Sequence, residues 1–297
     1  MIEDITIVVL KKLNHQYPNE VVSNFILDEN YWHIQSLIKF DSADVQIIGL
    51  WGMKGMGKTT LASALYNKVS FQYEGKCFFE DATEVSKKHG INYRFNRLLS
   101  KLLGEDLDID TPKVIPSKIR GRLKSMKSFI VLDDVHSSEL LQIMTGGGHG
   151  WLGAGSTVVV TTRDRHVLIN GGIDNIYEVE NMKSQNSLKL FCSNAFDTVL
   201  PKEGFVELSK TVIDYAQGNP LVLIVLGSSL RCKSEIEWNS ALAKLKKISN
   251  DKIDRILRWC SHGLDELDDN AEDIFFEIEY FFEEKVTSAL KAFYKSL

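Results

Sequence analysis

The chain lacks the features that would tie it to an oxidising compartment, a membrane or a structural metal. Its four cysteines lie far apart, which excludes a disulfide framework and favours reduced thiols in a cytosolic or nuclear setting. No apolar run approaches the roughly 20 residues of a membrane span. Glu3 and Asp4 stand where a signal peptide would have its basic region. The seven histidines show no metal-ligand spacing, and no Ser/His/Asp or Cys/His grouping indicates a nucleophilic site.

The chain also lacks a strong excess of either charge. Its net charge of −5 gives no global attraction to nucleic acid or to an anionic membrane. The short basic run at 244–247 is typical of the solvated face of a helix, so nucleic-acid binding is not expected. No internal repeat or low-complexity segment is present. With 297 residues, 44% of them hydrophobic and 25% charged, the chain has the composition of a globular protein with two or three domains.

Two kinds of hydrophobic pattern divide the chain near residue 181. Before it, apolar strands alternate with helical stretches, which predicts an α/β fold with a parallel sheet covered on both faces. After it, helical patterns dominate and predict an all-helical second unit. The expected strands lie at 45–51, 77–79, 129–135, 155–164 and 176–179, and the expected helices of the second part at 184–196, 203–216, 220–231, 235–247, 252–258 and 270–282.

The most informative segment reads Gly-Met-Lys-Gly-Met-Gly-Lys-Thr at residues 52–59. It matches the phosphate-binding loop pattern G-x-x-x-x-G-K-[ST] in full, between a β-branched strand and an amphipathic helix. Glycines let backbone N–H groups turn toward a polyphosphate. In this pattern Lys58 reaches the β- and γ-phosphates and the Thr59 hydroxyl binds Mg²⁺.

Two acids follow the apolar strand at 129–132. In a phosphate-loop fold the first acid at the end of such a strand lies beside Mg²⁺, which assigns that role to Asp133. Asp134 would orient or activate the attacking water. The alternative is that the two aspartates form only a loop or a helix cap.

Arg163 follows the next strand and is expected at the same edge of the sheet, where ligands bind in open α/β folds. Its guanidinium would contact the γ-phosphate and report its presence. The alternative is a surface arginine paired with Asp164 or Asp174. In the helical part, Gly218-Asn219-Pro220 indicates only a helix boundary on physical grounds.

Taken together and in their order along the chain, these motifs resemble those of the NB-ARC module of plant disease-resistance proteins. The resemblance is to the class with an N-terminal TIR domain and C-terminal leucine-rich repeats, and it covers nearly the whole chain. The matching stretches are 48–60, 129–135, 155–164, 218–221 and 274–282, with further similarity at 151–156 and 177–179.

The resemblance implies an ADP/ATP switch in immune signalling, in which exchange of ADP for ATP opens the protein and permits self-association. It implies phosphate binding by Gly52, Gly55, Gly57, Lys58, Thr59 and Thr60, Mg²⁺ binding by Thr59 and Asp133, and catalytic or sensing roles for Asp134 and Arg163. It also implies that Pro220 packs near the adenine, which would couple nucleotide state to domain arrangement. The implied partners are the nucleotide and other domains or chains of an immune receptor complex.

The resemblance further implies a linker helix at 1–20, a nucleotide-binding domain at 21–180, a helical ARC1 domain at 181–250 and part of a winged-helix ARC2 domain at 251–297. Four positions depart from the family pattern: Lys54 for Gly, the segment 24–28 for Val-Gly, Asn219 for Leu and Tyr280 for Cys. No TIR domain, repeat array or later Met-His-Asp motif is present. We therefore expect an excised fragment, a truncated gene product or a degenerate relative.

Three functions are compatible with these residues. The first is a signalling switch with slow ATP hydrolysis, supported by the phosphate loop, the paired acids and Arg163. The second is an efficient metabolic or mechanical NTPase, for which no substrate-domain signature is present. The third is a non-hydrolysing interaction adapter, motivated by Lys54 and the absent C-terminal motif. The switch is the prediction, and the adapter is its main alternative.

Overall fold

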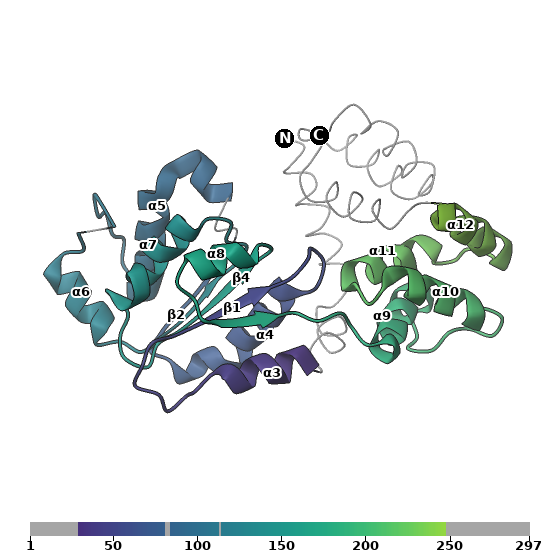
Figure 1. Ribbon diagram of the computed structural model, residues 1–297, viewed down its shortest axis with the longest axis horizontal. Helices are drawn as coiled ribbons and strands as arrows, with labels where there is room; N and C mark the ends of the chain where they lie inside the picture. Colours follow the sequence, from purple (N-terminus) through teal and green to yellow (C-terminus); the bar gives the residue numbers. More distant parts are fainter. Residues whose placement is uncertain (1–28, 81–83, 113, 248–297) are drawn as a thin grey trace. The chain divides into compact units, whose positions relative to one another are not determined.

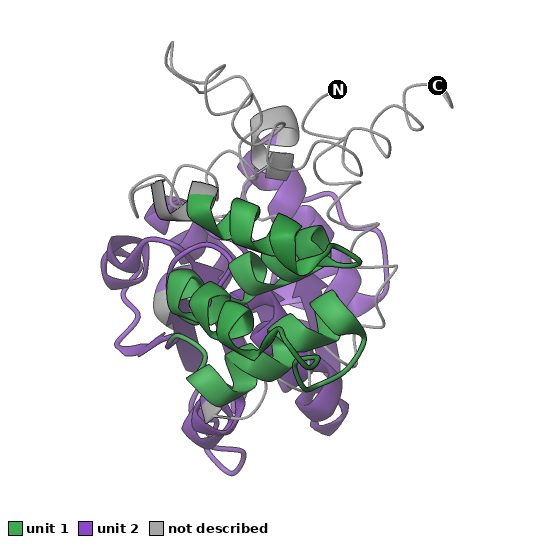
Figure 2. Ribbon diagram, turned by 90° about the vertical axis from the view of Figure 1, so that its right-hand side faces the viewer, with its two compact units in different colours: residues 1–25, 181–297 green, residues 26–180 purple. Residues whose placement is uncertain are grey.

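The computed structural model describes residues 29–80, 84–112 and 114–247. The predicted linker helix at 1–20, the helices at 252–258 and 270–282 and the winged-helix domain lie outside the described residues. The chain divides into two compact units between Glu180 and Asn181. Figure 2 shows the first unit along the described chain, residues 26–180, in purple and the described helices of the second unit in green.

The first unit, which begins at Ile26, is an α/β domain (Figure 1). Its strands alternate with helices along the chain, as the sequence predicts. The elements are α3 (Glu29–Leu37), β1 (Gln46–Trp51), α4 (Lys58–Val69), η1 (Ser70–Gln72), β2 (Gly75–Phe79), α5 (Glu84–Leu103), α6 (Ser117–Lys124), β3 (Ser128–Leu132), α7 (Ser138–His149), β4 (Thr157–Thr162), α8 (Arg165–Asn170) and β5 (Asn175–Glu178).

The five strands form one parallel sheet in the order β2-β3-β4-β1-β5. Strand β1 lies between β4 and β5, and its register with β4 pairs Trp51 with Thr162. Because all strands run the same way, the segments that follow β1, β3 and β4 emerge at one edge. The phosphate loop, the two aspartates and Arg163 follow those three strands, so the topology brings them together.

Helices cover both faces of this sheet, which explains why β3 and β4 are buried along their whole length. Figure 1 shows α3 and α4 on one face and α5, α7 and α8 on the other. The side chains of β3 alternate accordingly. Phe129 lies against Tyr66 and Tyr73 on the α4 side, with ring centroids 6.2 and 5.1 Å away. Ile130 and Leu132 join the core on the other face. Both faces therefore carry a hydrophobic core.

The described part of the second unit is entirely helical. Its core surrounds Trp238, which is fully buried. The indole stacks on Phe196 at a centroid distance of 5.4 Å, and its Nε1–H donates to the carbonyl oxygen of Leu230 at 2.9 Å. The helices are α9 (Ser184–Phe196), α10 (Val206–Ala216), α11 (Pro220–Leu230) and α12 (Glu235–Lys247).

The predicted fold class is confirmed for these residues: a parallel α/β sheet domain is followed by a helical unit. Within the described ranges, no helix has both the length and the apolar character needed to cross a bilayer.

Candidate functional site

The loop between β1 and α4 has the backbone of an anion cradle. Gly55 and Gly57 have φ angles of 80° and 86°, in the left-handed region that glycine adopts without strain. Gly57 is the N-cap of α4, and no side chain caps that helix end. The positive end of the helix dipole and the first amides of α4 are therefore suited to phosphate. The residues present fit the polyphosphate of a nucleotide.

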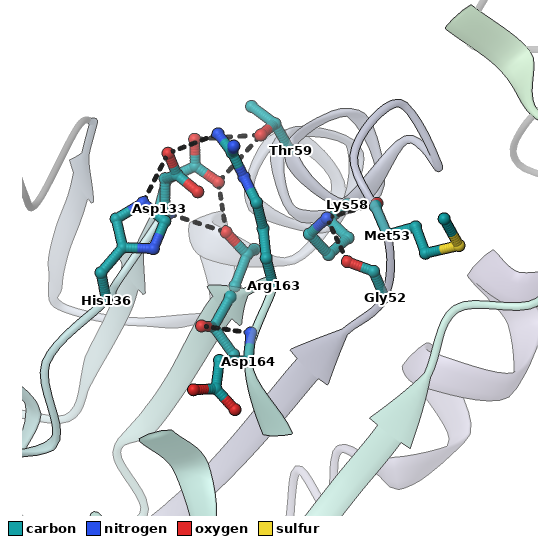
Figure 3. A network of polar contacts seen from close by, with 11 residues as sticks. Gly52, Met53, Lys58, Thr59, Asp133, His136, Arg163 and Asp164 are labelled. Atoms are coloured by element: carbon teal, nitrogen blue, oxygen red, sulfur yellow. Dashed lines mark hydrogen bonds and ion pairs between the residues drawn. The ribbon is translucent and has the colours of Figure 1, made fainter. Parts of the chain in front are cut away.

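Lys58 is the first residue of α4, and only 8% of its surface is exposed. Its Nζ donates to the carbonyl oxygens of Gly52 at 2.7 Å and Met53 at 2.8 Å, so the loop folds around the ammonium group (Figure 3). Burial, with a contribution from the nearby charge of Arg163, lowers the pKa of Lys58 to about 8. The loop thus holds a concentrated positive charge close to its own backbone.

Thr59 and Asp133 meet although 74 positions separate them in the chain. The Thr59 hydroxyl lies 3.0 Å from each carboxylate oxygen of Asp133, and the Thr161 hydroxyl donates to Oδ1 of Asp133 at 2.6 Å. A hydroxyl and a carboxylate are ligands that suit Mg²⁺, which usually keeps water and substrate phosphates in its remaining positions. In the described ranges no cluster of three or more His, Cys, Asp or Glu residues could hold a metal without such help. The donor set fits Mg²⁺ bound together with phosphate.

Asp134 has an unusual backbone and a strongly stabilised charge. Its φ of 53° lies in the left-handed region, and its N–H donates to the Thr161 hydroxyl at 2.9 Å. Oδ2 of Asp134 accepts from Arg163 at 3.1 Å and lies 3.2 Å from Nε2 of His136. Burial alone would raise the pKa of Asp134, but the hydrogen bond from His136 and the charge of Arg163 outweigh it and lower the pKa to about 2. Asp134 is therefore an anion at neutral pH.

The structure shows the contacts that bear on the alternatives for these acids and for Arg163, whose roles stay predictions. The cap of α7 is Ser137, whose side chain accepts from the N–H of Leu140, so neither Asp133 nor Asp134 serves as that cap. Asp164 caps α8 by accepting from the N–H of His166 at 2.8 Å. The described ion pair of Arg163 is with Asp134, at the phosphate-loop edge of the sheet, and not with Asp164 or Asp174.

Pro220 lies in the helical unit, in the first turn of α11. The preceding Asn219 caps this helix, because its side chain accepts from the N–H groups of Leu221 at 3.0 Å and Val222 at 3.3 Å. Gly218 has a φ of 77°, and a Cβ atom there would lie 2.4 Å from the carbonyl oxygen of Met182. Asn219 therefore performs a capping role that the commoner leucine lacks. The contact of Pro220 with adenine stays a prediction.

The structure thus brings Lys58 and Thr59 to the acids Asp133 and Asp134 and to Arg163. Lys58 is preceded by the loop that contains Gly52, Gly55 and Gly57, and Thr60 follows Thr59 in α4. Sequence reasoning assigned no role to two residues that hold this group in place. Thr161 is the next-to-last residue of β4, which pairs with β3. Its place near the end of a strand, directly before Thr162 and Arg163, was the only sequence signal for it. His136 stands in a loop whose course only the fold defines, and no pattern identified it.

Known proteins resemble this chain in sequence. A family model described as "NB-ARC domain" matches residues 32–200, more than half of the chain. "TMV resistance protein N" of Nicotiana glutinosa is 34% identical over 278 residues, which is 92% of this chain and 23% of that protein. "Disease resistance protein RPV1" of Vitis rotundifolia is 37% identical over 255 residues, which is 84% of this chain and 18% of that protein. The chain therefore spans less than a quarter of either relative.

Among solved structures, Cdc6p from Pyrobaculum aerophilum is similar with a TM-score of 0.44 and 15% sequence identity. That similarity covers 74% of this chain and 63% of the other.

Proposed function

Because the chain belongs to the NB-ARC family, we propose that it is the nucleotide-binding module of an ADP/ATP switch in plant immune signalling. One observation carries the proposal. A complete phosphate loop with a buried lysine lies beside a hydroxyl and a carboxylate that suit Mg²⁺, and an arginine lies at the same edge of the sheet. This combination supports nucleotide binding and a device that senses the terminal phosphate.

Each residue of the site has a specific role in this proposal. The amides of Gly52, Gly55, Gly57 and Thr60 and the ammonium of Lys58 bind the phosphates. Thr59 and Asp133 hold Mg²⁺, which neutralises phosphate charge when bound. Asp134 orients water, and Arg163 contacts the γ-phosphate when it is present. To bind phosphate, Lys58 exchanges its contacts with the carbonyls of Gly52 and Met53 for contacts with the ligand.

Coupling to the helical unit is the second part of the proposal. Pro220 contacts the adenine, so the nucleotide favours one arrangement of the two units over another. A ligand shifts such an equilibrium only by its difference in affinity for the two states. The ATP-bound arrangement self-associates and engages other domains or chains of an immune receptor, in the cytosol or the nucleus.

Slow hydrolysis fits a switch better than rapid turnover does. Oδ2 of Asp134 already accepts from Arg163, and it also lies within reach of His136. A carboxylate with a pKa of about 2 is a weak base at neutral pH, because its pKa lies far below the operating pH at which a general base is most effective. Asp134 therefore positions water rather than abstracting its proton efficiently. The expected ATPase is Mg²⁺-dependent and slow without a protein activator.

The test is to purify the protein without added nucleotide, denature it and identify the released nucleotide by chromatography. Stoichiometric ADP, followed by ATP turnover of a few cycles per hour or less, is the expected result. Rapid multiple turnover would favour a metabolic or mechanical NTPase. An empty protein whose melting temperature is unchanged by Mg-ADP and Mg-ATP would refute the switch and favour an interaction adapter, because a ligand of the native state must stabilise it.

A further inference from the structure

His136 and Arg163 share one oxygen of Asp134, which they approach from different segments of the chain. Arg163 follows β4, and His136 lies in the loop between β3 and α7. We propose that His136 is a positioning residue that holds Asp134 while Arg163 moves from Asp134 to the γ-phosphate, so that His136 sets the preference between ATP and ADP. This inference rests on the proposed nucleotide switch and deepens it.

The backbone and hydrogen bonds of Asp134 explain why its carboxylate needs a second hydrogen-bond donor besides Arg163. The left-handed backbone of this residue is strained for a side chain with a Cβ atom. Its N–H is held by the Thr161 hydroxyl, which also donates to Asp133. A carboxylate that shifted when Arg163 left would therefore disturb the adjacent Mg²⁺ ligand. His136 reduces that disturbance because it stays on Asp134.

The hydrogen-bond chemistry of the pair assigns the donor. A carboxylate oxygen only accepts hydrogen bonds, so Nε2 of His136, 3.2 Å from Oδ2, carries the hydrogen. The side chains of Asp134 and His136 are 27% and 36% exposed, so water weakens but does not remove the interaction. In either protonation state the imidazole can donate this bond. The support therefore does not depend on a charged histidine.

Arg163 is placed to leave Asp134 for a phosphate. Its charge reaches the phosphate loop, since it contributes to the lowered pKa of Lys58. Its side chain is 30% exposed and extends from the end of β4 toward the loop (Figure 3). With ADP bound, Arg163 remains on Asp134. With ATP bound, it transfers to the γ-phosphate, and Asp134 loses part of its compensating charge.

This difference between states gives the direction of the effect. Removing His136 destabilises the ATP-bound state, in which Arg163 has left Asp134, more than the ADP-bound state, in which Arg163 remains on Asp134. His136→Ala should therefore weaken binding of ATP relative to ADP. The ratio of the Kd for ATP to the Kd for ADP should rise by about threefold to tenfold, the scale of one net hydrogen bond.

The test measures Kd by calorimetry for Mg-ADP and for the Mg²⁺ complex of a non-hydrolysable ATP analogue. The variants are His136→Ala, His136→Gln, Arg163→Ala and the double variant H136A/R163A. We expect the raised ratio in His136→Ala, recovery in His136→Gln, which keeps an N–H donor, and no effect of His136→Ala in the Arg163→Ala background. If His136→Ala does not fold, His136→Phe removes the donor and keeps the ring.

The outcomes separate this inference from the proposed function. If the unsubstituted protein binds neither nucleotide, the proposed switch fails and the inference fails with it. If it binds both and the ratio is the same in His136→Ala, only the inference is overturned. An equal change with and without Arg163 would also overturn it, because His136 would then act on the fold and not on the transfer of Arg163.

Discussion

Two cations are buried in the same α/β unit, in opposite surroundings. Lys58 is 8% exposed, donates to two backbone carbonyls and lies within the electrostatic reach of Asp133 and Asp134. Arg94, in α5, is fully buried, and none of its three side-chain nitrogens has a hydrogen-bond partner among the residues that the structure describes. Burial lowers the pKa of both groups, to about 8 for Lys58 and about 10 for Arg94.

The comparison distinguishes Lys58, a buried cation in a binding site, from Arg94, a buried cation outside it. An unpaired buried charge destabilises a fold, whereas partners offset much of that cost. Around Lys58 the partners are built by the loop and by two strand ends, and an incoming phosphate would add to them. Leu98 and Leu102, one and two helical turns after Arg94 in α5, are buried and apolar. Burial of a cation therefore marks a site only where the fold also supplies its partners.

Removing the Lys58 ammonium should have the largest effect, a loss of nucleotide binding. Lys58→Ala should raise the Kd for Mg-ADP by about 100-fold or more, because a charge-assisted contact to phosphate is lost. Calorimetry measures the Kd, and the stabilisation by Mg-ADP in thermal melting should disappear with it. Lys76→Ala, at an exposed position of β2 in the same unit, is the matched control and should change the Kd by less than about threefold, given a surface substitution's usual effect. Retained micromolar affinity in Lys58→Ala would contradict the assignment.

Removing the cation without partners should stabilise the protein. Arg94→Leu should raise the free energy of unfolding by about 1 to 4 kcal/mol, because a buried unpaired charge is replaced by an apolar side chain of similar length. Urea denaturation measures the change, and the Kd for Mg-ADP should stay the same. Arg120→Leu, at an exposed position of α6 in the same unit, is the matched control and should change stability by less than about 0.5 kcal/mol. A lower free energy of unfolding in Arg94→Leu would contradict the prediction and show that Arg94 makes a stabilising interaction.

The acids near Lys58 should separate Mg²⁺ binding from phosphate binding. Asp133→Asn should weaken Mg-ATP binding by about tenfold, since a neutral amide is a poorer Mg²⁺ ligand than a carboxylate. In the presence of a chelator, the same variant should bind ATP about as well as the unsubstituted protein. Calorimetry with and without Mg²⁺ makes the comparison. An equal loss under both conditions would mean that Asp133 supports the loop and not the metal.

The smallest effect concerns the pH dependence of stability. The folded-state pKa of Asp134 is about 2, below its ordinary value of 3.8. Such a group contributes stability that is fully present above the unfolded-state pKa and is lost as the pH falls through the folded-state pKa. The difference in unfolding free energy between the unsubstituted protein and Asp134→Asn should be constant above about pH 5 and shrink toward about pH 2. Urea unfolding across this range would detect it, and a difference independent of pH would refute the lowered pKa.

Much of the fold and of the site was open to prediction, because both follow from local patterns. The continuous apolar runs at 129–132 and 158–160 predict strands buried on both faces, and β3 and β4 are buried throughout. Residues after strands of one parallel sheet must emerge at one edge, so the meeting of Lys58, Asp133 and Arg163 was predictable in outline. The partner of Arg163 was not, since Asp164 and Asp174 were nearer in sequence than Asp134.

By itself, the sequence determined the phosphate loop, the order of strands and helices and the acids beside the loop. These features depend on residue type and spacing over short stretches. Only the tertiary structure decided that Arg163 and His136 share one oxygen of Asp134 and that Thr161 links the two aspartates. It also decided that Arg94 is buried with no hydrogen-bond partner among the described residues. These contacts depend on how distant segments pack, and packing is set by the whole core rather than by any local pattern.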